Sequence, residues 1–305
     1  MGFSVTILGS SSAKPTPSRH QSGQIININE QFFLVDGGEG VQQQMFRYGI
    51  NPLKLRAIFV SHLHADHVYG IFPLLSTMSL YGRKTAIKIY APAPFGAMLE
   101  SYREFFGGDL AYEVEWIEVD CTKHQIIFEN RTLEVWSVPL RHRLPTSGYI
   151  FREKAPALNV DKFKITKYAL SIAQITAAKR GEDITLESGE VIANSELTYI
   201  PYSPRSYAYI SDTAYAPPVA ERCKGVDMLY HEATYAAVEA KTAKERGHST
   251  THQAANIAAA AGVKRLLIGH FSSRYKDLKP LREEAQTIFP NSELALEGES
   301  FEIER

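Results

Sequence analysis

The sequence has little cysteine, no excess of either charge and no long apolar run. Only Cys121 and Cys223 occur in 305 residues, which argues against a disulfide framework and favours a reducing compartment, the cytoplasm. The formal net charge of −1 predicts no general attraction to nucleic acid, so a polyanionic substrate would need a local basic face or metal charge. We expect no membrane partner and no secretion signal, because no segment has the required apolar pattern.

Strand and helix patterns alternate along a chain that is 44% hydrophobic, which predicts one large α/β domain with an insertion. Residues 40–49, 68–81, 95–106 and 253–261 have helical patterns. We expect strands at residues 3–8, 24–35, 56–61 and 86–90, and antiparallel strands within 111–137. A mixed sheet, or two, covered by helices is the expected architecture.

Residues 152–201 differ from the rest because they are rich in lysine. Helical spacing of Ile165, Ala169, Ile172 and Thr176 predicts one helix ended by Gly181. A small hairpin is expected within 183–191. We interpret the segment as an arm-like insertion in a single domain of residues 1–305, although its charge alone fits an ordinary solvated helix.

The densest chemical signal is Ser-His-Leu-His-Ala-Asp-His at residues 61–67. It follows an apolar run, so the cluster lies where a strand ends. Alternate residues leaving a strand point the same way, and His62 and His64 can therefore converge on one ion. Asp66 and His67 can reach a second ion beside it. Imidazole and carboxylate ligands suit Zn²⁺, with Mn²⁺ or Fe²⁺ as substitutes.

Three further ligand candidates, His142, Asp212 and His270, each follow an expected strand. Singly, each residue type is more often structural. Together they repeat one arrangement, a ligand held at the rim of a sheet. Asp212 has two oxygens and can bridge both ions.

Two motifs have no evident place in a coordination shell. His248 precedes the 253–261 helix, for which Ser249, Thr250 or Thr251 is the expected cap, and a helix N-terminus is a natural place to meet a phosphate. Glu232 can accept the second ring proton of His248 and orient it. His231 is interpreted as a hydrogen-bonded core histidine.

The ligand motif at 61–67, followed in order by His142, Asp212 and His270, resembles the metallo-β-lactamase superfamily. Within it, His231-Glu-Ala-Thr234 and His248-Ser-Thr250 are similar to the tRNase Z family. Agreement also comes from Leu8-Gly-Ser10, Pro-Thr-Pro-Ser-Arg at 15–19, residues 35–40, and Gly148-Tyr149. The resemblance places the tRNA-gripping arm at 152–201, which lacks the Gly-Pro pair that this arm commonly carries.

The resemblance implies an αββα sandwich of two mixed sheets flanked by helices, two Zn²⁺ per subunit, a homodimer and a precursor tRNA substrate. One zinc would be held by His62, His64, His142 and Asp212. The other would be held by Asp66, His67, His270 and the same Asp212. The reaction expected is hydrolysis of the 3′ trailer, leaving a 3′ hydroxyl on the tRNA and a 5′ phosphate on the trailer. Asp66 would steer a proton, and His248, oriented by Glu232, would protonate the departing 3′ oxygen.

Two other functions fit part of the pattern. A binuclear-zinc phosphodiesterase acting on cyclic nucleotides or other small phosphodiesters would use the same ligands. A non-catalytic, metal-stabilised RNA-binding protein would need neither a complete ligand set nor a candidate acid.

Overall fold

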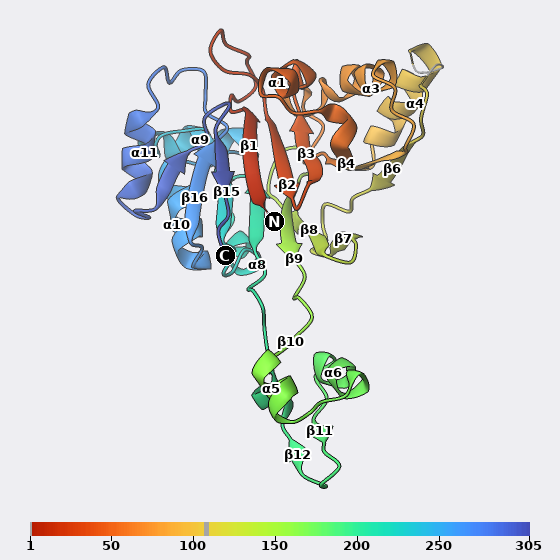
Figure 1. Ribbon diagram of the computed structural model, residues 1–305. Coiled ribbons are helices and arrows are strands. Elements are labelled where there is room, and N and C mark those ends of the chain that lie inside the picture. Colours follow the sequence, from red (N-terminus) through yellow and green to blue (C-terminus); the bar gives the residue numbers. More distant parts are fainter. Residues whose placement is uncertain (1, 107–109) are drawn as a thin grey trace.

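Two sheets lie face to face with helices on both outer sides in the computed structural model, which describes residues 2–106 and 110–305 (Figure 1). The first sheet runs, in spatial order, β18 (Ser300–Glu302), β1 (Phe3–Gly9), β2 (Gly23–Ile28), β3 (Gln31–Gly37), β4 (Leu55–Phe59), β5 (Ile87–Ala91) and β6 (Val114–Glu118). The second runs β17 (Ser292–Leu294), β16 (Arg265–Gly269), β15 (Met228–Glu232), β14 (Ser206–Ile210), β9 (Ser147–Glu153), β8 (Leu133–Pro139) and β7 (Ile126–Glu129). Both sheets contain parallel and antiparallel pairs. The predicted αββα sandwich is therefore confirmed.

Three apolar layers hold the sandwich together. The inner layer joins the two sheets, where Phe59 packs edge-on against Phe151 with ring centroids 5.2 Å apart. Burying each such side chain stabilises the fold by about 1.5–3 kcal/mol. The outer layers lie under α1 (Val41–Arg47), α3 (Ile71–Leu80) and α4 (Phe95–Phe105) on one side, and under α8 (Pro218–Arg222), α10 (Thr251–Ala261) and α11 (Lys279–Gln286) on the other. No helix in the described residues is long and apolar enough to cross a bilayer.

Short helices complete the body: η1 (Pro52–Lys54), α2 (Ala65–Val68), η2 (Ala237–Glu239) and α9 (Ala240–Arg246). The predicted helix at 68–81 is interrupted, because α2 ends and α3 begins around Gly70. A Cβ at Gly70 would lie 1.9 Å from the carbonyl oxygen of Gly38. Only glycine allows the α2–α3 junction and the β3–α1 connection to approach so closely.

Two strand predictions are wrong in detail. Residues 24–35 are not one strand but the hairpin β2–β3, which turns at Asn29 and Glu30, with φ of 53° and 64°. Two successive positive φ values are the geometry of a tight hairpin turn. Within 111–137, β6 pairs in parallel with β5 in the first sheet, and only β7 and β8 are antiparallel neighbours. The alternating pattern at 111–137 therefore spans two sheets.

The segment between β9 and β14 extends away from the sandwich as an arm (Figure 1). It contains β10 (Asn159–Val160), α5 (Lys162–Lys167), α6 (Ile172–Lys179), β11 (Ile184–Thr185), β12 (Val191–Ile192), α7 (Asn194–Leu197) and β13 (Thr198–Tyr199). The single helix predicted here is two helices, because Ala169 has a φ of 48° and Ser171 begins α6 with a capping box. The expected hairpin is β11–β12. A small apolar cluster holds the arm together.

The two strands that carry the arm leave the sandwich at a definite end. β9 begins at Ser147, whose N–H donates to the carbonyl of Ser61, and it runs away from the 61–67 loop to Glu153. β14 returns from the arm and finishes beside Asp212. The arm and the ligand cluster thus lie at opposite ends of the same strands.

Candidate metal centre

The polar cluster is assembled from loops that follow the strands of both sheets. The 61–67 loop follows β4, His142 lies between β8 and β9, Asp212 follows β14 and His270 follows β16. Their ligand atoms form two groups, each with all atoms within 4.8 Å of one another. One group is His62, His64, His142 and Asp212, and the other is Asp66, His67 and His270. The structure thus brings together all seven residues that the sequence nominated as ligands.

Three residues at this end of the sandwich adopt strained backbone conformations. Asp36, Asp212 and His270 have φ of 56°, 54° and 58°. This is the left-handed backbone region, which residues other than glycine seldom adopt. Each comes at or just after the end of a strand. Such strain persists where the surrounding fold enforces it, and it is concentrated at functional sites.

Hydrogen bonds fix which ring nitrogen of each histidine faces the cluster. The Nδ1–H of His67 donates to Oδ2 of Asp36 at 2.7 Å, because an ionised carboxylate only accepts. Ser61 Oγ donates to the same carboxylate at 2.8 Å and accepts from Nδ1–H of His62 at 3.0 Å. The Nε2 lone pairs of His62 and His67 are therefore left for the cluster.

The same arrangement recurs on the other side of the cluster. His142 Nδ1–H donates to the carbonyl of Gly247 at 2.8 Å. His270 Nδ1–H donates to Oγ1 of Thr234 at 2.9 Å, since that hydroxyl gives its own proton to Glu232. Both rings again present Nε2. His64 presents Nδ1, which lies 2.8 Å from Nε2 of His62. Outer hydrogen bonds of this kind orient metal-binding imidazoles.

The cluster has the chemistry of a cation site. His67 Nε2 and His270 Nε2 are buried and make no hydrogen bond, although Asp212 oxygens lie 3.4 Å and 3.0 Å away. Burial together with the adjacent His62 and His142 rings lowers the pKa of His64 to about 4, so it is a neutral donor at pH 7. Burial opposes a proton on His67, but Asp212, Asp66 and Asp36 raise its pKa. The carboxylates that favour a proton there also favour a divalent cation, so the residues present fit a divalent metal site.

Glu232 and His248 form a hydrogen-bonded pair beside the cluster. Glu232, the last residue of β15, is fully buried, and its Oε1 accepts from Nδ1–H of His248 at 2.9 Å. Its carboxylate also accepts from the N–H groups of Thr213 and Thr234. Burial lowers the pKa of His248, but the Glu232 carboxylate outweighs this effect and raises it. The ring therefore keeps a proton on Nε2 to higher pH and can donate it.

Thr250 caps α10 through a capping box and places His248 just before that helix. His248 also lies within reach of Asp212 and His270. Its Nδ1–H is held by the buried carboxylate of Glu232, as that of His67 is held by Asp36. His231 belongs to no such group in the described chain, and its Nδ1 contacts the carbonyl of Glu232 at 2.7 Å.

Sequence reasoning missed the residues that support the ligands. The sequence marks Asp36 as the end of a strand and as part of the family resemblance at 35–40, without a role, yet this residue holds His67, Ser61 and Tyr209. The N–H of Ala13 donates to Oδ2 of Asp66 at 2.8 Å, which ties the 12–19 loop to the cluster. A buried-type strand that ends in an aspartate was the available signal for Asp36.

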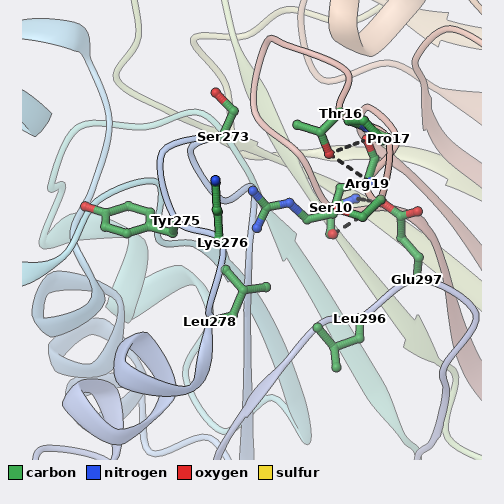
Figure 2. Close-up of a pocket in the computed structure, with 11 residues that line it drawn as sticks. Ser10, Thr16, Pro17, Arg19, Ser273, Tyr275, Lys276, Leu278, Leu296 and Glu297 are labelled. Atoms are coloured by element: carbon green, nitrogen blue, oxygen red, sulfur yellow. Dashed lines mark hydrogen bonds between the residues drawn. The ribbon is translucent and has the colours of Figure 1, made fainter.

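Two cavities border this end of the molecule. One, of about 680 Å³, lies between the 12–19 loop and the segment after His270, and Figure 2 shows Arg19 and Lys276 directed into it. The other, of about 730 Å³, is lined by His142, His248 and part of α9. The cluster is therefore accessible to a ligand on the side of His248.

Comparisons with known proteins agree with this geometry. A family model described as Anti-Pycsar protein Apyc1 matches residues 3–102. Ribonuclease Z of Parabacteroides distasonis is 42% identical over 296 residues, 97% of each chain. Ribonuclease Z of Phocaeicola vulgatus is 41% identical over 302 residues, 99% of this chain and 98% of the relative.

Solved structures show the same fold. Human tRNase Z, short form, superposes with a TM-score of 0.73 at 24% identity, covering 99% of this chain and 100% of that one. The metallo-β-lactamase fold protein YhfI of Bacillus subtilis has a TM-score of 0.69 at 20% identity, with 98% of each chain covered. The expected metallo-β-lactamase fold is thus confirmed.

Proposed function

Since this chain belongs to the ribonuclease Z family, we propose that it is a hydrolase that removes the 3′ trailer from precursor tRNA. The products are a tRNA with a 3′ hydroxyl and a trailer with a 5′ phosphate. The observation that carries the proposal is the convergence of seven ligand-type side chains beside the buried Glu232–His248 pair. Full-length similarity to ribonuclease Z selects tRNA over small phosphodiesters.

Seven residues would hold two Zn²⁺ per subunit. His62, His64 and His142 would hold one ion, and Asp66, His67 and His270 the other, with Asp212 shared between them. Nitrogen and carboxylate donors in this ratio suit zinc, and Mn²⁺ or Fe²⁺ are substitutes. When bound, the ions would supply Lewis acidity toward a phosphodiester and lower the pKa of water from about 15.7 to roughly 7.

The protein's own groups would manage the protons. Asp66, held by the N–H of Ala13, would steer the proton of the attacking water. His248 would donate from Nε2 to the departing 3′ oxygen, because Glu232 fixes its Nδ1–H and favours the charged ring. General acid assistance of this kind contributes about 10²–10⁴-fold in rate.

A homodimer would make use of the arm. The arm leaves the end of β9 and β14 that is remote from the metal centre, so we propose that it presents tRNA to the partner's site. Large apolar side chains on α1 and at the C-terminal ends of α3 and α4 are exposed and offer a surface for the second copy: Phe46 (41%), Leu80 (87%), Tyr81 (61%), Phe105 (70%) and Phe106 (80%). Sedimentation of a Leu80→Glu/Tyr81→Glu variant should show a monomer. An unchanged dimer would exclude this face.

A tRNA substrate and two free cysteines support a cytoplasmic location.

The proposed activity is tested by incubating zinc-loaded protein with a trailer-bearing precursor and mapping the cut. A single cut after the discriminator base, with the stated end groups, is expected. Cleavage of a small chromogenic phosphodiester with the precursor left intact would point instead to a phosphodiesterase. Tight tRNA binding without any cleavage would indicate a non-catalytic RNA-binding protein.

A further inference from the structure

The cavity beside His142 and His248 has a basic wall. It is lined by Arg141 and Arg143 on one side and by Lys241 and Lys244 of α9 on the other. All four side chains are exposed. Glu245 is the acidic residue of the lining. In the described part of the chain, none of the four cations forms an ion pair. The cavity therefore carries a positive potential, in a protein whose formal net charge is −1.

This wall is tied to the metal centre. His142 lies between the two arginines, and its Nδ1–H bond to Gly247 joins their loop to the end of α9. Arg143 Nη2 donates to the carbonyl of Glu245 at 3.0 Å, and the carbonyl of Arg141 accepts from the N–H of Ala214 at 2.8 Å. A ligand gripped by this wall would thus be held in a defined position relative to the reacting phosphate.

Gly247 sets how closely the two sides approach. Its φ is 76°, and a Cβ there would lie 2.9 Å from Nδ1 of His142. A side chain would therefore push α9 away from the 141–143 loop. The volume of about 730 Å³ that remains is within the ~300–1,000 Å³ range of ordinary ligand pockets.

We propose that this cavity is the subsite for the RNA strand on the 5′ side of the cut, the 3′ end of the mature tRNA. Lys241 and Lys244, together with the two arginines, bind its backbone phosphates. His248 indicates which side of the cut lies here, because it lines this cavity. It protonates the departing 3′ oxygen, which belongs to the strand on the 5′ side. The inference rests on the proposed function. It adds which side of the cut the cavity binds and which residues bind it.

The test compares a Lys241→Ala/Lys244→Ala variant with a matched Lys84→Ala/Lys224→Ala control, whose lysines are also exposed and lie outside the cavity. Alanine suits the exposed face of α9, so the fold should be kept. Substrates are an unmodified precursor tRNA, precursors with one neutral methylphosphonate either 5′ or 3′ of the cut, and a small chromogenic phosphodiester. The readouts are kcat, KM and the salt dependence of kcat/KM.

We expect the cavity variant to lose roughly tenfold in kcat/KM on the precursor, mainly through KM. Its salt slope should fall by about 0.7 for each phosphate that a lysine no longer neutralises. Its activity on the small phosphodiester should not change. The 5′ methylphosphonate should impair the wild type but add little to the variant's defect, whereas the 3′ methylphosphonate should impair both equally.

Three results would overturn the inference while leaving the proposed function intact. The first is an unchanged KM in the cavity variant, and the second is an equal loss of kcat/KM in the control variant. The third is that the defects of the cavity variant and the 3′ methylphosphonate, instead of the 5′ one, fail to add. Failure of the wild type to cut the unmodified precursor is a separate outcome. It would refute the proposed function, and the RNA subsite with it, before any variant is compared.

Discussion

Replacing Asp36 by asparagine should weaken metal binding although Asp36 is not itself among the candidate ligands. Its buried carboxylate accepts four hydrogen bonds: from the N–H of Ser61 at 2.7 Å, Ser61 Oγ at 2.8 Å, Tyr209 Oη at 2.7 Å and His67 Nδ1 at 2.7 Å. The first of these goes to Oδ1 and the other three to Oδ2. An amide can keep an acceptor at only one of the two positions.

The choice between the two amide orientations can be decided by energy. The backbone N–H of Ser61 cannot rotate, and facing it with an NH₂ group would leave a buried donor unpaired, at about 1–3 kcal/mol. Hydroxyl groups can rotate to accept, so the NH₂ should take the Oδ2 position. His67 Nδ1 must then accept, and its proton moves to Nε2, the nitrogen that faces the ligand cluster. Asp36→Asn should thus place a proton where a metal ion would bind.

Removal of such an outer hydrogen bond costs about 10–100-fold in metal affinity, which corresponds to about 1.4–2.7 kcal/mol. The assay is competition for Zn²⁺ with a chromogenic chelator. Asp227→Asn is the matched control, because Asp227 also accepts from the N–H and Oγ of a serine, Ser206, at the arm end of β14. Zinc affinity within about twofold of wild type in Asp36→Asn, with the fold retained, would refute the argument.

Four further outcomes are expected. His248→Ala should lose about 10²–10⁴-fold in kcat while binding two equivalents of zinc by metal analysis; loss of an ion would make His248 a ligand. Asp212→Ala should lose metal and activity together, and full activity with one ion would contradict its shared position. Glu153→Gln should lower the free energy of unfolding near pH 7 by about 3–5 kcal/mol, because it breaks the buried pair with Arg205 (2.7 Å). Burial raises the pKa of Glu153, but hydrogen bonds from Arg205 outweigh this effect, so the pKa is lowered below 4.5. The stability from the pair is therefore present above about pH 4.5 and is lost as the pH falls below that value. A difference in unfolding free energy between wild type and Glu153→Gln that stays constant from pH 7 to pH 3 would count against this prediction. Combined charge reversal of the arm lysines should weaken tRNA binding and reduce the salt dependence of that binding in titrations; the residues are Lys162, Lys164, Lys167 and Lys179. No change in either quantity would exclude a phosphate-binding arm.

The course of the chain was only partly predictable. The periods of α1, α4 and α10 and the apolar runs of β1, β4 and β5 identify those elements, because local burial alone produces the pattern. The Asn29–Glu30 turn was missed because neither residue is a glycine. The break at Ala169 was missed because the apolar spacing continues across it.

The sequence by itself determined which chemical groups are available and that each follows a strand, because these are local properties of the chain. All seven nominated ligands, and the pairing of Glu232 with His248, could be proposed at that level. For His67, His142 and His270, tertiary structure decided which nitrogen faces the cluster, because the acceptors come from distant segments. Gly247, which holds His142, lies 105 residues away. The acceptor for His62 is local, since it is the adjacent Ser61. Tertiary structure also decided that the arm leaves the end opposite the metal centre, since the direction of a strand relative to the sheet depends on non-local pairing that no local pattern encodes.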